Sequence, residues 1–340
     1  MAKLRIAIVG LGMAVTPHAQ SYLQLRDRVE VVYAFSPSAE RRRAFAEKFP
    51  FPLADGLDQI LADNSVGIVT LLTPPNTHLE LVRRCAQAGK HILLEKPLEI
   101  SAARCTELVE LCEAHCVTLG VVLQHRFRAG GEHLHDLLEK GALGRIVSAS
   151  VTILNWRPQA YYDEPGRGDR NRDGSGVLLT QGIHTLDLYL SLVGMPEQVF
   201  AYACTSAVHE METEDLVAGC QRFAGGALGT VHATTTAYPG LPEGITIIGE
   251  SATAHLSGTS LNVAYHDGRR ESHQADGSSG GAGADPMAFP NDYHRAVITD
   301  FLDALEQRRV PRVSGREALK VHRLIDCLLQ SAETGEPVAI

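Results

Sequence analysis

The chain reads His91-Ile92-Leu93-Leu94-Glu95-Lys96-Pro97 near the end of its first third, a short apolar run that ends in a carboxylate, an ammonium and a proline. Three bulky aliphatic residues in succession predict a strand that is buried on both faces, as in a parallel sheet covered by helices. Ligands of open α/β sheets bind beyond the carboxyl ends of the strands, where Lys96 stands. Taken alone, Glu95-Lys96-Pro97 is more typical of a Glu-Lys pair on a solvated loop, and the rest of the chain changes this interpretation.

Composition limits the class of protein. The chain has 340 residues, of which 44% are hydrophobic and 21% charged, and its net charge is −9. This length predicts two domains, and the acidic surface argues against nucleic acid or an anionic membrane as partner. The start lacks a secretory signal and no apolar run approaches the roughly 20 residues of a membrane span, so we expect a cytoplasmic protein. Seven scattered cysteines predict reduced core residues, with no disulfide framework and no metal site.

A glycine turn follows the first expected strand. Residues Leu4–Val9 predict a buried strand, Gly10-Leu11-Gly12 follows at once, and a helix is expected from about Thr16 to Leu25. Gly10 allows a tight turn and Gly12 lets a pyrophosphate approach the backbone, while the helix supplies N–H groups. The third glycine of this fingerprint would fall on Val15, which weakens the pattern without removing the phosphate site. A plain structural turn is the alternative reading of the glycines.

The end of the next expected strand, Val29–Phe35, is where the adenosine ribose of a dinucleotide should lie. A carboxylate there would bind the 2′-hydroxyl of NAD, and the sequence has none. It offers Ser36, Ser38 and Arg41 instead, whose hydroxyls and guanidinium suit a 2′-phosphate. We therefore expect NAD(P), with a preference for NADP. The alternative is that the arginines only decorate the exposed face of the helix at 39–48.

Further elements complete an alternating β/α pattern. The loop Thr73-Pro74-Pro75-Asn76-Thr77-His78 follows a strand at 67–72, and its two prolines predict a stiff wall beside the nicotinamide ribose. Helices are expected near 57–62, through residue 88 and at 101–115, and a further strand at 118–123. Such alternation predicts a doubly wound parallel sheet.

Together these motifs carry a resemblance. The sequence G-L-G at Gly10, His18 in the following helix, T-P-P-N-T-H and E-K-P resembles the Gfo/Idh/MocA family of NAD(P)-dependent sugar and cyclitol oxidoreductases, and the tail from Asp300 onward is similar to that family's C-terminal helices. The resemblance implies an α/β fold with an N-terminal Rossmann domain over residues 1–123. It also implies a substrate-binding and oligomerisation domain over residues 124–340 with a large, mainly antiparallel sheet, and a homodimer or homotetramer.

The second half of the chain changes character. Strands are expected at 146–154, 198–205, 216–223, 227–236, 245–248 and 261–265, and turn signals between them indicate antiparallel pairing. Helices are expected at 293–307 and 315–331. Residues 267–292 are rich in glycine, serine and aspartate without periodicity, which is typical of an active-site lid or of disorder.

A glycine cluster at Gly174–Gly176 is expected to open a helix on which Thr180, Gln181, His184 and Asp187 share one face. The resemblance assigns His184 as general acid/base and Lys96 as hydrogen-bond donor to the reacting oxygen. Many members carry an aspartate at the position of Thr180, so His184 should be less basic here. Asp187 is a possible substitute, although pairing elsewhere is the better expectation.

The expected site residues form two groups. Cofactor-binding residues are Gly10, Gly12, Met13, Ser36, Ser38, Arg41, Thr73, Pro74, Asn76, His78, Glu95, Lys96 and Gln124. Substrate-binding residues are Lys96, Arg126, Trp156, Arg157, Tyr161, Thr180, Gln181 and His184. For the aromatic and arginine side chains the alternative is that they pack the sheet edge and neutralise nearby acids.

The predicted function is hydride transfer between NAD(P) and a secondary alcohol or ketone of a sugar, cyclitol or sugar derivative. Two alternatives stay open. The first is an NAD-dependent glycoside hydrolase of the same family, and the second is a non-catalytic dinucleotide-binding regulator. The presence of both Lys96 and His184 favours an enzyme.

Overall fold

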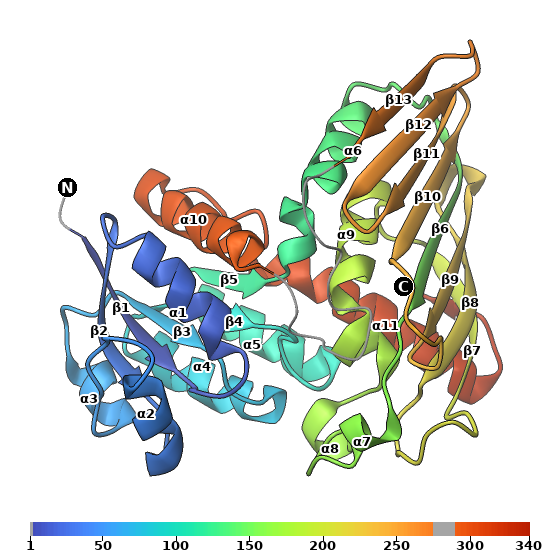
Figure 1. The fold of residues 1–340 in the computed structure, drawn as a ribbon. Helices are drawn as coiled ribbons and strands as arrows, with labels where there is room; N and C mark the ends of the chain where they lie inside the picture. Colours follow the sequence, from blue (N-terminus) through green and yellow to red (C-terminus); the bar gives the residue numbers. More distant parts are fainter. Residues whose placement is uncertain (1–2, 275–289) are drawn as a thin grey trace. The chain divides into compact units, whose positions relative to one another are not determined.

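The computed structural model describes residues 3–274 and 290–340, and the contacts of the chain divide it into two compact units. Unit 1 holds the chain up to Leu123 together with Pro290–Leu319, and unit 2 holds Gln124–Phe289 together with Lys320–Ile340. Figure 1 draws both with the element labels used below.

Unit 1 is built on a five-stranded parallel sheet in the order β2-β1-β3-β4-β5. Its strands are β1 (Leu4–Val9), β2 (Val29–Phe35), β3 (Ile68–Leu71), β4 (His91–Glu95) and β5 (Leu119–Val122). Ile92, Leu93 and Leu94 of β4 are at most 1% exposed, as a strand covered on both faces requires. The expected doubly wound parallel sheet is confirmed.

Helices flank this sheet. They are α1 (Val15–Gln24), α2 (Ala39–Ala46), α3 (Leu57–Ala62), the 3₁₀ turn η1 (Pro75–Thr77), α4 (His78–Gln87), α5 (Ala102–Ala114) and α10 (Asp292–Gln307). Ser38 caps α2 and Ser101 caps α5, each accepting a backbone N–H three residues on.

A late segment of the chain completes unit 1. Helix α10 packs against α1, and the N–H of Val121 in β5 donates to the carbonyl of Val313 over 2.9 Å. A Cβ on Gly120 would lie 2.5 Å from Cδ2 of Phe301, so glycine lets the α10 ring lie directly on β5. Residues more than 150 positions apart thus share one core.

Unit 2 contains a nine-stranded sheet in the order β13-β12-β11-β10-β6-β9-β8-β7-β14. Its strands are β6 (Ile146–Leu154), β7 (Gln198–Cys204), β8 (Leu216–Arg222), β9 (Leu228–Thr234), β10 (Gly244–Gly249), β11 (Ala252–Ser257), β12 (Ser260–Tyr265), β13 (Arg270–His273) and β14 (Val338–Ala339). Neighbouring strands are antiparallel except β6 and β9, which are parallel. The expected large, mainly antiparallel sheet is confirmed.

The sequence did not predict β11 or helix α6. The buried positions of β11 include Ala252 and Ala254, which give a weak apolar signal. The remaining helical elements are η2 (Gln124–Phe127), α6 (Ala129–Glu139), α7 (Gln159–Tyr162), α8 (Arg170–Asp173), the π-helix η3 (Val177–Gln181), α9 (Ile183–Val193), η4 (Ala224–Gly226) and α11 (Gly315–Thr334). Of the segment expected to lack structure, residues 270–273 form β13 and residues 275–289 lie outside the described part.

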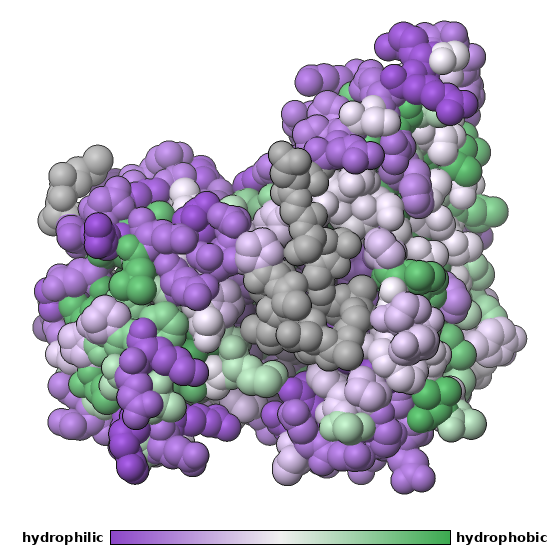
Figure 2. All heavy atoms as spheres, viewed as in Figure 1, coloured by the Kyte–Doolittle hydropathy of each residue, from purple (hydrophilic) through white to green (hydrophobic). Residues whose placement is uncertain are grey.

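Helices cover one face of the unit 2 sheet. The other face carries both polar and apolar side chains. On that outer face Tyr202 is 69%, Leu228 61% and Ile248 42% exposed. Figure 2 shows apolar surface, in green, at the right-hand side of the view, where Figure 1 draws these strands. Among the described residues, no helix is long and apolar enough to cross a membrane.

Candidate active site

The glycine turn of unit 1 is tight. Gly10 has a φ of +103°, and a Cβ there would lie 2.6 Å from both the carbonyl carbon and the oxygen of Leu72, so only glycine fits. A Cβ on Gly12 would meet only Arg41, whose Nη1 would lie 3.9 Å away. Ala14, the N-cap of α1, makes no side-chain hydrogen bond to the helix, so its first N–H groups are not capped by a side chain. This turn can receive a pyrophosphate.

The expected ribose-binding residues gather beside this turn. Arg41 is exposed, and its Nη1 would lie 3.9 Å from a Cβ placed on Gly12. Ser36 is buried, and its hydroxyl accepts the N–H of Ser38 over 3.3 Å. Arg42 donates to the carbonyl of Ser36. A positive charge therefore lies next to the phosphate turn, while no carboxylate occupies the end of β2.

The side chain of His78 anchors the loop that runs from Thr73 to His78. This imidazole is fully buried, with Nε2 2.8 Å from the carbonyl of Thr73 and Nδ1 3.0 Å from that of Pro97. Burial lowers the pKa of His78, and the carbonyl contacts oppose this shift. Because Pro97 follows Lys96, His78 ties the loop after β3 to the backbone after β4. Pro74 and Asn76 are exposed, so they are available for a ligand.

A buried polar trio lies at the carboxyl end of β4. Nε2 of His18, in α1, donates to Oε1 of Glu95 over 2.7 Å, and Nε2 of His294, in α10, lies 3.9 Å from the same oxygen. Burial raises the pKa of Glu95, but His18, His294 and Lys96 outweigh this effect and lower the pKa. Burial lowers the pKa of His294 to about 3, so its imidazole is neutral. Glu95 is thus a buried, ionised carboxylate.

Glu95 also controls the backbone of Lys96. Its Oε2 accepts the N–H of Lys96 over 3.0 Å, and the Lys96–Pro97 peptide bond is cis. The ligand atoms of the trio lie within 4.8 Å of one another, which is compatible in kind with a metal ion, but the His18–Glu95 distance is that of a hydrogen bond. The trio therefore serves to fix the start of the Lys96 loop.

In unit 2 a π-helix precedes the candidate catalytic helix. Glu214 accepts the N–H of Gly176 over 2.8 Å and that of Leu178 over 3.4 Å, and its carbonyl accepts the N–H of Val177 over 2.9 Å. A Cβ on Gly176 would lie 1.8 Å from that carbonyl oxygen, so glycine is required. Burial raises the pKa of Glu214. Single π turns of this kind recur at functional sites.

The π turn changes the expected arrangement of Thr180, Gln181, His184 and Asp187. These residues do not continue one α-helix, because η3 ends at Gln181 and α9 begins at Ile183. Thr180 donates to the carbonyl of Gly176 over 2.7 Å. Asp187 accepts two hydrogen bonds from Arg126, at 2.7 and 2.6 Å. The expected single helix is therefore divided at Gly182, and the contacts given for Thr180, Gln181 and Asp187 are to different partners.

His184 lies against a second histidine. Its ring centroid is 4.9 Å from that of His125, which belongs to η2, and the rings are tilted by 33°. Nδ1 of His125 lies 3.2 Å from the hydroxyl of Thr185 and 3.5 Å from Oε2 of Glu243. The neighbouring Gln124 is buried, and its Oε1 has no hydrogen-bond partner among the described residues. An amide oxygen left in this way suits a ligand donor such as a carboxamide.

The expected substrate residues Arg157, Tyr161 and Gln181 form one network. Arg157 is 1% exposed and donates from Nε and Nη2 to Oε1 of Gln181 at 3.1 and 2.6 Å. Gln181 donates to the hydroxyl of Tyr161 over 2.9 Å, and the guanidinium of Arg167 lies 4.0 Å from the Tyr161 ring. Burial lowers the pKa of Arg157. The network fixes the positions of the Gln181 amide and the Tyr161 hydroxyl.

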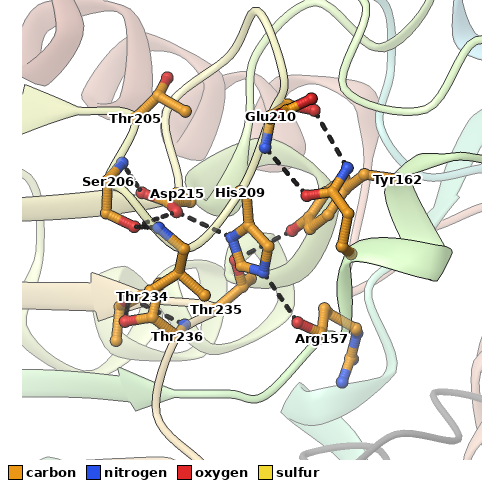
Figure 3. A network of polar contacts seen from close by, with 12 residues as sticks. Arg157, Tyr162, Thr205, Ser206, His209, Glu210, Asp215, Thr234, Thr235 and Thr236 are labelled. Atoms are coloured by element: carbon orange, nitrogen blue, oxygen red, sulfur yellow. Dashed lines mark hydrogen bonds and ion pairs between the residues drawn. The ribbon is translucent and has the colours of Figure 1, made fainter.

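A buried dyad of His209 and Asp215 contacts the backbone of Arg157, as Figure 3 shows. Nδ1 of His209 lies 2.8 Å from Oδ2 of Asp215, and its Nε2 lies 2.8 Å from the carbonyl of Arg157. Asp215 also accepts the N–H and the hydroxyl of Ser206 at 2.7 Å each. The ring of Trp156 lies 6.4 Å from His209 and packs edge-on against Tyr238 at 5.5 Å. The backbone that carries Trp156 and Arg157 is therefore fixed.

Sequence reasoning missed several of these supports. Glu214 and Asp215 are adjacent acids at the start of an apolar strand, an unusual position that could have marked both as buried. His294 and Glu243 gave no signal, because each reaches its partner from a distant part of the chain. His125 stands three residues after the buried strand β5, where strand-end logic would have included it.

Comparison with known proteins defines the class. Residues 4–123 match the family model described as an oxidoreductase family with an NAD-binding Rossmann fold, and residues 132–255 match the C-terminal domain model of the same family. The chain belongs to the Gfo/Idh/MocA oxidoreductase family, and it is an enzyme of the NAD-binding oxidoreductase class.

The chain is similar in sequence to several dehydrogenases and oxidoreductases. The chain is 27% identical to D-xylose 1-dehydrogenase (NADP(+)) 2 of Haloferax volcanii, over 88% of this chain and 89% of that protein. It is 29% identical to myo-inositol 2-dehydrogenase of Thermotoga maritima, over 72% and 73%. An uncharacterised oxidoreductase of Streptococcus pneumoniae is 30% identical, and the chain spans 52% of its length. The WlbA dehydrogenase of Bordetella pertussis, solved with NADH and UDP-GlcNAcA, is 28% identical with a TM-score of 0.84, over 100% of this chain and 99% of that one.

Proposed function

We propose that this protein transfers a hydride between NAD(P) and a secondary alcohol or ketone of a sugar, cyclitol or sugar derivative. The observation that carries the proposal is Lys96 at the carboxyl end of β4, directly after a buried, ionised Glu95 that binds its N–H. A lysine anchored at a strand end is positioned to meet a ligand beyond the sheet. The sugar and cyclitol dehydrogenases among the relatives support the substrate class.

Two residues divide the proton chemistry in this proposal. When bound, the nicotinamide accepts or supplies the hydride. His184 takes the hydroxyl proton during oxidation and returns it during reduction, because an imidazole changes protonation state near neutral pH. Lys96 donates a hydrogen bond to the reacting oxygen. Gln181 and Tyr161, held by Arg157, orient the substrate hydroxyls through the amide and the ring.

The cofactor fits unit 1. Gly10 and Gly12 leave the backbone of unit 1 accessible to a pyrophosphate. Gln124, the first residue of unit 2, is proposed to hold the carboxamide through its amide. We propose a preference for NADP, because Arg41 lies beside the phosphate turn and no carboxylate ends β2. The NADP-dependent relative from Haloferax volcanii supports this preference, whereas the Bordetella pertussis relative was solved with NADH.

Residues 1–123 are proposed as the NAD(P)-binding domain and residues 124–340 as the substrate-binding and oligomerisation domain. The exposed Tyr202, Leu228 and Ile248 lie on the outer face of the unit 2 sheet, and apolar strand residues of this kind are commonly covered by a second copy. A homodimer or homotetramer follows from this proposal. Light scattering coupled to gel filtration would measure it.

A substrate panel tests the activity. Inositols, aldoses and uronic acids are supplied with NAD and with NADP, and reduced nicotinamide is followed by its absorbance. Lys96→Ala and His184→Ala should each reduce turnover by about 10²–10⁴ and leave cofactor affinity close to that of the wild type. Lys140→Ala, which removes an exposed lysine at the end of α6, is the matched control. Full turnover in both active-site variants would contradict the proposal.

A further inference from the structure

We propose that Glu214 and Asp215 are positioning residues for the substrate, because this one dipeptide anchors both segments of unit 2 that are proposed to hold the sugar. The first segment is the π turn η3, which carries Gln181, and the second is the stretch 155–161, which carries Arg157. This inference rests on the proposed function and adds two residues that act through the proposed substrate contacts. Both are buried, Glu214 being 8% and Asp215 0% exposed.

Glu214 holds the beginning of η3. Its carboxylate accepts the N–H of Gly176 over 2.8 Å and that of Leu178 over 3.4 Å. Its carbonyl accepts the N–H of Val177 over 2.9 Å. The first N–H groups of a helix have no partner inside the helix, so a single residue satisfies three consecutive donors here. Because η3 is only five residues long, the position of Gln181 at its end depends on where Glu214 holds its start.

Asp215 holds the second segment through His209. Nδ1 of His209 lies 2.8 Å from Oδ2 of Asp215, and its Nε2 lies 2.8 Å from the carbonyl oxygen of Arg157. Figure 3 shows the imidazole between the carboxylate and this backbone. The same carboxylate accepts the N–H and the hydroxyl of Ser206, so it also fixes the loop that carries His209. The backbone of Arg157 therefore has a defined position relative to Asp215.

The two segments also contact each other directly. Nε and Nη2 of Arg157 donate to Oε1 of Gln181 at 3.1 and 2.6 Å, and Gln181 donates to the hydroxyl of Tyr161 over 2.9 Å. The contacts thus form a closed ring, which runs through Glu214, η3, Gln181, Arg157, His209 and Asp215 and closes over one peptide bond. Groups that belong to one network are energetically coupled, so opening the ring at one anchor should loosen both segments.

The charge of Glu214 makes a conservative test possible. Burial raises the pKa of Glu214, and the N–H groups of Gly176 and Leu178 and the charge of Arg170 oppose this shift. Glu214→Gln removes one acceptor of the ring, and it also removes the cost of burying a charge. We therefore expect this variant to fold, so that an effect on the substrate can be separated from an effect on stability.

Hydrogen–deuterium exchange of the cofactor-free protein tests the ring without turnover. In both Glu214→Gln and Asp215→Asn, peptides covering 174–184 and 155–163 should exchange faster than in the wild type, by about tenfold for each lost hydrogen bond. Glu210→Gln is the matched control and should change neither peptide, because this exposed acid of the same loop contacts Gln159 through its backbone. Faster exchange only in the segment that the altered side chain itself holds would overturn the inference.

Kinetics supply the functional arm, with the best substrate among inositols, aldoses and uronic acids. E214Q and D215N should each raise the KM for this substrate and lower kcat/KM by up to about 10²-fold, because small displacements of orienting groups are costly. The affinity for NADPH and the number of NADPH sites should stay unchanged, whereas a loss of folded protein would reduce the number of sites.

A double variant separates a ring from two independent supports. Glu214→Gln combined with Asp215→Asn should lose little more than either single variant, since the ring is already open after the first change. Losses that multiply would overturn the inference. If D215N does not fold, His209→Ala opens the same side of the ring and leaves Asp215 bound to Ser206. An enzyme that is inactive on the whole panel would contradict the proposed function, and the exchange measurement would still decide whether the ring exists.

Discussion

Glu95 accepts a 2.7 Å hydrogen bond from His18, and both side chains are almost completely buried. The carboxylate sits one residue before Lys96 and binds its N–H. This relationship joins α1 to the end of β4, so the helix that follows the glycine turn also fixes the loop of the candidate lysine. Phosphate site and lysine are therefore supported by the same two elements of unit 1.

The first prediction concerns the stability of this pair. The pKa of Glu95 is lower in the folded protein than in the unfolded chain, where it is about 4.3. Its ionisation therefore contributes stability above that value, and the contribution is lost as the pH falls through the folded pKa. Glu95→Gln should cost about 1.5–3 kcal/mol at neutral pH and less in acid. Chemical denaturation at several pH values measures this, and an equal cost at all pH values would contradict it.

The second prediction separates two glycines. Gly10→Ala should destabilise the protein by about 1–3 kcal/mol or more, because of its positive φ and the clash with Leu72. Gly12→Ala should fold normally, since its Cβ would lie 3.9 Å from Arg41, yet it should weaken cofactor binding. Thermal unfolding and a fluorescence titration with NADPH distinguish the two effects. Equal stability of both variants would be inconsistent with the geometry.

The third prediction concerns cofactor preference. Arg41→Ala should weaken NADPH binding by about 10- to 100-fold, because a hydrogen bond to a charged group contributes about 1.5–3 kcal/mol. NADH binding should change little. Arg43→Ala, an exposed arginine in the same helix, is the matched control. Equal losses for both cofactors would show that Arg41 does not read the 2′-phosphate.

The fourth prediction concerns the buried ion pair of Arg126 and Asp187. Asp187→Asn removes the charge that matches a guanidinium only 10% exposed, and breaking such a pair costs about 3–5 kcal/mol. Glu250→Gln removes the partner of Arg145, which is 74% exposed, and should cost under about 1 kcal/mol. Denaturation midpoints compare the two variants, and similar costs would refute the distinction.

Local patterns predicted the core of unit 1. The apolar run of β4 is buried, the glycine turn follows β1, and the strands are parallel. These features depend on residues close in sequence, so periodicity and turn chemistry suffice. The two serine caps of α2 and α5 are equally local.

Features that depend on distant partners could not be read in this way. The π turn before α9 requires Gly176 to lie against the backbone of Glu214, nearly 40 residues away. The contact of His125 with His184 spans 59 positions. Helix α10 has an ordinary amphipathic pattern that does not state which sheet it covers. Tertiary packing determines the π turn, the contact of the two histidines and the position of α10.

The return of residues 290–319 to unit 1 has a consequence for biosynthesis. A ribosome releases the strands of the first sheet long before it makes Phe301, Val313 or His294, so the ring that covers Gly120 and the imidazole beside Glu95 arrive last. Until then β5 lacks its cover and must be shielded from premature association. The nucleotide-binding unit can therefore complete its fold only after nearly the whole chain has been translated.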